Sequence, residues 1–231
     1  MQTETQTVTT KPLRDVRGFW RILLAVIAPL PMLGMGLYNI FSPVDGGSSF
    51  EDTVAAYAAN EQTIGLVQWF GVPFVVLLIP ATFAVAWASR RGAPLLTTFG
   101  AFVALLGFLS GLPLIQGGDK LAYLTVKHDL DVATMSNLQS LMEEEPTQLA
   151  GLLFIIGIVF GLLLLGLALW RSGAAPKWMG IALAVGGFTH PFIPGHVAAG
   201  VGLLVAAVGF AGASVALLRM DNDGFDLPPA R

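Results

Sequence analysis

Two of the three histidines, His190 and His196, lie close together in the stretch FTHPFIPGH, between two apolar runs. A pair of neutral imidazoles can bind Zn, Cu or haem iron. Because Pro191, Pro194 and Gly195 predict a tight turn, we expect the two imidazoles to face each other across a helical hairpin. Their spacing matches no zinc-enzyme signature. A metal or haem site, a pH-sensing pair and a purely structural turn are therefore all open interpretations.

A second set of polar side chains lies near the ends of the apolar runs, on what would be one side of a helical bundle. No Asp, Glu, Lys or Arg occurs within the runs, which argues against a proton-driven pump or a carrier that uses buried carboxylates. We expect the polar set to line the rim of a ligand-binding cavity. Its members are Tyr38, Asn39, Gln68, Trp69, Gln116 and His190.

The chain carries no recognisable catalytic motif. It has no glycine-rich phosphate loop with a lysine, no G-x-S-x-G, no H-E-x-x-H and no basic patch for nucleic acid. Because it has no cysteine, disulfides and thiolate metal ligands are excluded. We assign no catalytic residue and name no cofactor, and a non-enzymatic function is favoured.

Composition places the chain in a membrane. Of 231 residues 55% are hydrophobic and 12% charged, and the mean hydropathy is +0.72. Crossing a hydrocarbon core takes roughly 20 helical residues, and lipid offers backbone polar groups no partner outside their own helix. The sequence predicts an all-α bundle of six transmembrane helices. Their ranges are 22–41, 63–88, 94–115, 149–170, 178–193 and 196–218.

Charge predicts the orientation of this bundle in the plasma membrane. If the N-terminus is cytoplasmic, most basic residues fall in cytoplasmic segments and most acidic ones in two outer loops, as the positive-inside rule requires. Both termini are then cytoplasmic. The basic residues on that side are Lys11, Arg14, Arg17, Arg21, Arg90, Arg91, Arg171, Lys177, Arg219 and Arg231, whereas only Lys120 and Lys127 are outside.

The outer loops are expected to contain short amphipathic helices. Ser49 followed by Asp52 resembles a capping box, and Asp131 is a plausible N-cap before a helical apolar face. Pro146 suits the first turn of the fourth transmembrane helix. The polar segments 1–17 and 221–231 are expected to be disordered, which leaves residues 18–220 as one transmembrane domain.

Small residues predict how the helices pack, because lipid gives no hydrophobic drive for their association. Two G-x-x-x-G motifs, at Gly107 and Gly157, and a small-residue stripe along 198–216 are expected to make contacts within the chain, with self-association as the alternative. Prolines within the first two apolar runs, at 29, 31, 73 and 80, predict either kinks that open a cavity or the ordinary tolerance of membrane helices for proline.

The stretch RSGAAPKWMGIALAVGG, residues 171–187, resembles small uncharacterised six-helix integral membrane proteins of high-GC bacteria, in which a basic turn R-x-G-x-x-P-x-W links two late helices. The resemblance covers about the last 70 residues, and the remainder by hydropathy alone. It implies a membrane location and carries over no functional residue.

The sequence therefore predicts a non-enzymatic binding, sensing or accessory protein with an outward-facing apolar cavity. Its expected partners are membrane lipid and either an apolar small molecule or another membrane protein, and not nucleic acid. One alternative is a small transporter or channel subunit for an uncharged substrate. Another is a metal- or haem-binding redox protein built on His190 and His196.

Overall fold

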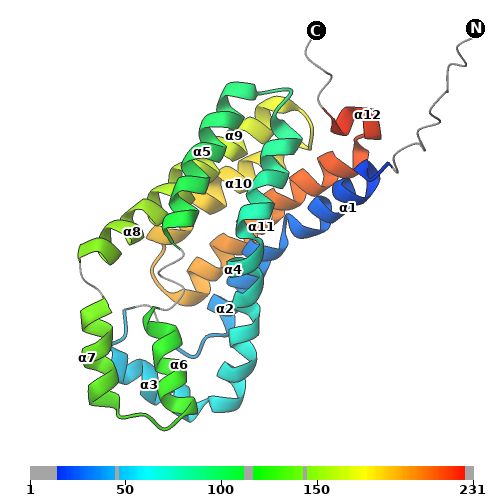
Figure 1. Ribbon diagram of the computed structural model, residues 1–231. Coiled ribbons are helices and arrows are strands. Elements are labelled where there is room, and N and C mark those ends of the chain that lie inside the picture. Colours follow the sequence, from blue (N-terminus) through cyan, green and yellow to red (C-terminus); the bar gives the residue numbers. More distant parts are fainter. Residues whose placement is uncertain (1–14, 45–46, 112–116, 143–144, 227–231) are drawn as a thin grey trace, which may run out of the picture.

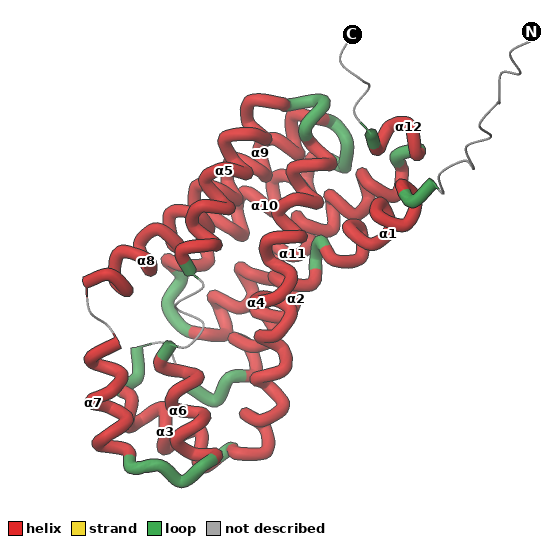
Figure 2. Tube along the Cα trace, viewed as in Figure 1, coloured by secondary structure: helices red, strands yellow, loops and turns green. Residues whose placement is uncertain are grey.

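The computed structural model describes residues 15–44, 47–111, 117–142 and 145–226, and within these ranges the secondary structure is helical (Figures 1 and 2). The long bundle contains most of the helices, and a smaller layer of three short helices lies at one of its ends. The bundle comprises α1 (Arg17–Ile27), α2 (Leu30–Phe41), α4 (Glu61–Ser89), α5 (Pro94–Ser110), α8 (Glu145–Ile156), the π-helical turn η2 (Gly157–Gly161), α9 (Leu162–Ser172), α10 (Lys177–Thr189), the 3₁₀ turn η3 (His190–Phe192) and α11 (His196–Arg219). The outer layer comprises α3 (Phe50–Ala59), α6 (Gly118–Lys127) and α7 (Val132–Met142), and α12 (Asn222–Phe225) follows the bundle.

Four helical segments of the described chain are long and apolar enough to cross a membrane. They are Arg17–Phe41, Glu61–Ser89, Pro146–Ser172 and His196–Arg219. The other two predicted spans are helical but shorter, with 17 residues in α5 and 13 in α10. At 1.5 Å per residue these rise about 26 and 20 Å, less than a hydrocarbon core of about 30 Å. The all-α class is confirmed, and four of the six predicted spans are candidate membrane spans by length and composition.

Proline acts differently in the first two spans. The first span is broken between α1 and α2, where Pro29 is the N-cap and Pro31 lies in the first turn of α2. A proline has no N–H to donate, so it interrupts one helix and suits the start of the next. By contrast, α4 continues through Pro73 and Pro80. A break in the helix therefore accompanies the prolines of the first span, whereas the second span stays one continuous helix.

The outer layer has its own apolar core. Ser49 caps α3 by accepting a hydrogen bond from the amide of Asp52, and Asp131 accepts one from the amide of Thr134 at the start of α7. Both predicted helices are thus confirmed. The apolar face of α3 packs against α6 and the beginning of α4, with Tyr57 fully buried. The sequence analysis missed α6, whose ten residues have no side-chain cap at their N-terminus.

Close glycine contacts join α5 to the π-helical turn. A Cβ on Gly157 would lie 2.6 Å from the Cα of Gly107, and a Cβ on Gly161 would lie 2.6 Å from the Cα of Ala104. Real Cβ atoms do not approach that closely, so the two backbones are in contact only because these positions are glycine. Both predicted G-x-x-x-G motifs therefore make contacts within the chain.

The same kind of contact positions α10 between α9 and α11. A Cβ on Gly186 would lie 2.7 Å from the carbonyl oxygen of Gly202, and a Cβ on Gly166 would lie 2.7 Å from that of Gly180. The predicted stripe of α11 contacts α10 at three positions, where Gly202 and Ala206 meet Gly186 and where Gly209 meets Leu183. The glycine pair of α9 and α10 was not recognised in the sequence.

The bundle leaves apolar side chains on its outside. On α5, residues at helical spacing form one exposed apolar stripe: Leu95, Phe99, Phe102, Leu106 and Leu109. Exposed apolar areas of this extent are unusual in soluble monomers and normal where lipid surrounds a helix. The exposed surface therefore agrees with the long apolar helices.

Both described chain ends lie at the end of the bundle opposite the outer layer (Figure 1). There, residues 220–226 pack onto α1 and α4, and we call this segment the C-terminal clasp. Phe225 is 7% exposed and its ring lies 5.5 Å from that of Trp87. Its carbonyl oxygen accepts hydrogen bonds from Trp87 Nε1 at 2.8 Å and from Arg90 at 2.5 Å.

Ionic contacts complete the clasp. Arg17 forms ion pairs with Asp15 at 2.9 Å, Asp223 at 3.1 Å and Asp226 at 3.4 Å. Hydrogen bonds from Arg17 lower the pKa of Asp15 to about 2, so this carboxylate is ionised at neutral pH. Disorder was predicted for 1–17 and 221–231. The structure describes residues 15–17 and 221–226 with these contacts, and no local pattern in the sequence predicts such contacts. Residues 1–14 and 227–231 lie outside the described ranges.

Alanine at Gly107 should destabilise the bundle, because the new methyl group would meet the backbone of Leu153 and Gly157. Overpacking of this kind costs about 1–3 kcal/mol. Gly65→Ala is the matched control, since the nearest atom to a Cβ there is 4.0 Å away. Thermal unfolding in mild detergent should show a lower Tm for Gly107→Ala only. Equal Tm values for the two variants would contradict the packing described.

Phe225→Ala should release the C-terminal clasp without unfolding the bundle. Burying a Phe side chain contributes about 1.5–3 kcal/mol, and the clasp has few other apolar contacts. Hydrogen exchange measured by mass spectrometry should become faster in residues 220–226 and stay unchanged in α9 and α10. Unchanged exchange in the clasp would show that its polar contacts alone hold it.

Candidate functional site

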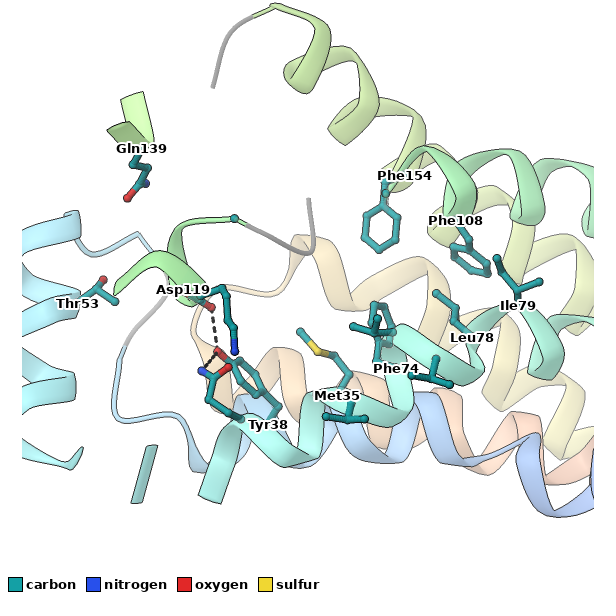
Figure 3. A pocket seen from close by; sticks show the side chains of 18 of the residues that line it. Met35, Tyr38, Thr53, Phe74, Leu78, Ile79, Phe108, Asp119, Gln139 and Phe154 are labelled. Carbon is teal, nitrogen blue, oxygen red and sulfur yellow. Dashed lines mark hydrogen bonds between the residues drawn. The ribbon is translucent and has the colours of Figure 1, made fainter. Parts of the chain in front are cut away.

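A cavity of about 690 Å³ lies where the bundle meets the outer layer (Figure 3). Side chains from α2, α4, α5 and α8 form its wall on the bundle side, and side chains from α3, α6 and α7 form its other end. Its volume falls within the range of about 300–1,000 Å³ that is typical of small-molecule sites. The cavity is therefore large enough for an organic ligand.

Polar groups gather at the outer end of this cavity. The hydroxyl of Tyr38 donates to Asp119 Oδ2 at 3.2 Å, and Gln68 Nε2 donates to the same hydroxyl at 3.5 Å. The hydroxyl of Tyr57 lies 3.5 Å from that of Tyr38. Burial raises the pKa of Tyr57, and the negative charge of Asp119 raises it further, so this phenol is neutral. Lys120 also lines this end.

The opposite end of the cavity is apolar and aromatic. Phe154 of α8 packs edge-on against Phe74 of α4, with ring centres 6.3 Å apart, and lies 6.1 Å from Phe108 of α5. A Cβ on Gly111 would overlap the ring of Phe154, so this glycine makes room for the ring. Figure 3 shows the three rings together, beside Leu78 and Ile79.

One side of the cavity is open to the surroundings of the bundle. Val72, Val75 and Val76 of α4 line the cavity and are also 44%, 42% and 62% exposed. Exposed positions of a membrane-spanning helix face lipid. Residues that line the cavity are therefore also accessible from outside the bundle on this side.

Two of the six residues expected at the rim line the cavity. Tyr38 and Gln68 do so, and they are hydrogen-bonded to each other. Asn39 instead donates to the carbonyl oxygen of Met35 at 2.9 Å, and Trp69 is 71% exposed; neither lines the cavity. Gln116 and the side chain of His190 lie outside the described residues.

The histidine hairpin is present as a backbone feature. His190 begins η3, His196 begins α11, and Gly195 between them has a φ of +87°, which favours glycine. Nδ1 of His196 is buried and has no hydrogen-bond partner among the described residues. No group of three or more possible metal ligands is found in the part of the chain that the structure describes. A metal or haem site at this hairpin stays a prediction.

The sequence analysis missed most of the apolar lining, including Met35, Phe74, Phe108 and Phe154, and the acidic group Asp119. One feature of the sequence, the prolines of α4, did point toward the cavity. The cavity residues of α4 run from Gln68 to Ile79, and five of them lie between Pro73 and Pro80, where kinks that open a cavity were one of the two interpretations. Asp119 carried no such signal, because it belongs to the missed helix α6.

Comparison of the chain with protein-family models, curated proteins and solved structures finds no match. The fold and the cavity define it as an all-helical protein with candidate membrane spans and an amphipathic cavity. The resemblance to six-helix bacterial membrane proteins stays a prediction.

Proposed function

We propose that this chain is a multi-pass membrane protein that binds an apolar or lipid-like molecule, without catalysing a reaction, in the cavity between the bundle and the outer layer. The observation that carries this proposal is the cavity itself, about 690 Å³ with an aromatic end and a polar end. Ligand sites are commonly apolar pockets with a few convergent polar groups. A molecule with an apolar body and one polar end fits this division.

In the proposed topology α5 and α10 also cross the plasma membrane, which gives six spans. Short helices can cross by local thinning of the bilayer, at a modest cost per ångström of mismatch. Four arginines lie at the clasp end and each donates a hydrogen bond to a backbone carbonyl oxygen of residues 220–226. They are Arg17, Arg21, Arg90 and Arg91. The positive-inside rule places that end in the cytoplasm and the acidic outer layer outside the cell.

The binding proposal is tested by filling the cavity. Gly71 lines the cavity and a Cβ there would make only ordinary contact, at 3.7 Å from the Tyr38 ring, so Gly71→Leu should fold and occupy ligand space. Binding of a dansyl-labelled long-chain alcohol, which has no charged head group, to purified protein should weaken about tenfold or more, equivalent to about 1.4 kcal/mol.

Gly65→Leu is the matched control, because it makes the same change in the same helix outside the cavity lining. It should bind the dansyl-labelled alcohol as the unchanged protein does. Equal binding by the two leucine variants, or no binding by the unchanged protein, would refute the proposal.

The orientation is tested by labelling single cysteines, since the chain has none of its own. Ser140→Cys in α7 and Asp223→Cys in α12 both place the thiol at exposed positions. In intact cells a membrane-impermeant maleimide should label Ser140→Cys and should reach Asp223→Cys only after the membrane is opened. The reverse pattern would overturn the proposed topology.

A further inference from the structure

The outer end of the cavity carries two opposite charges side by side. Asp119 and Lys120 both line the cavity, and the carboxylate of Asp119 is anchored by the hydroxyl of Tyr38. The Lys120 ammonium also lies 5.2 Å from the centre of the Tyr123 ring, within cation–π distance. A ligand head group therefore meets one negative and one positive group.

The rest of the outer layer is acidic. Lys127 is the other basic residue of its helices, whereas the described acidic residues nearby are Glu51, Asp52, Glu61, Asp129 and Asp131. This excess of acidic over basic residues disfavours a head group with net negative charge and favours one that carries a cation beside its anion.

The polar end must supply the selectivity for a ligand taken from lipid. An acyl chain that leaves the bilayer for the apolar end of the cavity exchanges one apolar environment for another, so it gains little hydrophobic free energy. Charge-assisted hydrogen bonds at the head group do discriminate, because an ammonium with N–H donors can bind a carboxylate and a phosphate can bind a lysine.

Taken with the opening beside Val72, Val75 and Val76, the geometry points to a zwitterionic phospholipid of the phosphoethanolamine type as the ligand of this cavity. The primary ammonium binds Asp119, the phosphate binds Lys120, and one acyl chain lies along α4 toward Phe108 and Phe154. The second chain stays in the bilayer beside the exposed valines. This inference rests on the proposed function, since it specifies the molecule bound at the same site.

The test is the lipid composition retained by the full chain after purification from vesicles of equal parts phosphatidylethanolamine, phosphatidylcholine and phosphatidylglycerol. Native mass spectrometry in mild detergent should show the ethanolamine lipid enriched about tenfold over the glycerol lipid, the ratio that about 1.4 kcal/mol gives. Asp119→Asn and Lys120→Gln should each remove most of this preference. Their matched controls, Asp129→Asn and Lys127→Gln, change the same charges outside the cavity lining and should keep it.

The outcomes separate this inference from the proposed function. If all three lipids are retained equally, if the glycerol lipid is preferred, or if the Asp119 and Lys120 variants keep the preference, the head-group assignment is overturned while lipid binding stands. If Gly71→Leu and the unchanged protein retain the same lipids in the same amount, the cavity is not the site and both proposals fail.

Discussion

Close contact between helix backbones at glycine and alanine is the constraint on which the rest of this structure depends. Lipid does not drive apolar helices together, so their association requires many short contacts. Such contacts occur where Gly107 meets Gly157 and where Gly186 meets Gly202 and Ala206. They place α5, η2, α10 and α11 at distances that larger side chains would forbid.

The cavity lies where the close backbone contacts between helices end. Toward the clasp end, α5 and the segment formed by η2 and α9 are joined through glycine. Toward the outer layer, aromatic rings from α4, α5 and α8 stand between the helices instead, at Phe74, Phe108 and Phe154. Rings of this size hold backbones apart, and the outer layer covers the end of the space with polar groups. The aromatic end of the cavity follows from this change in residue size, and its polar end is formed by Tyr38, Gln68 and the outer layer.

The candidate site was partly predictable from the sequence. Tyr38 and Gln68 were expected at the rim because they are polar residues near the ends of apolar runs, and they do line the cavity. Asn39 and Trp69 share that property but lie on other faces of their helices. A difference of one position turns a side chain by about 100° around a helix. Hydropathy along the chain does not predict which face of the helix a side chain occupies.

From the sequence alone we could predict the helical class, the long apolar segments that could cross a membrane and the approximate helix limits, because these follow from composition and from backbone hydrogen bonding within each segment. The sequence also predicted the caps at Ser49 and Asp131, which are local interactions. The three-dimensional arrangement of the helices was needed to see that Asp119 meets Tyr38, 81 positions away in the chain, and that Phe225 packs on Trp87, 138 positions away. Contacts between distant residues depend on the mutual placement of whole helices, which no local pattern encodes.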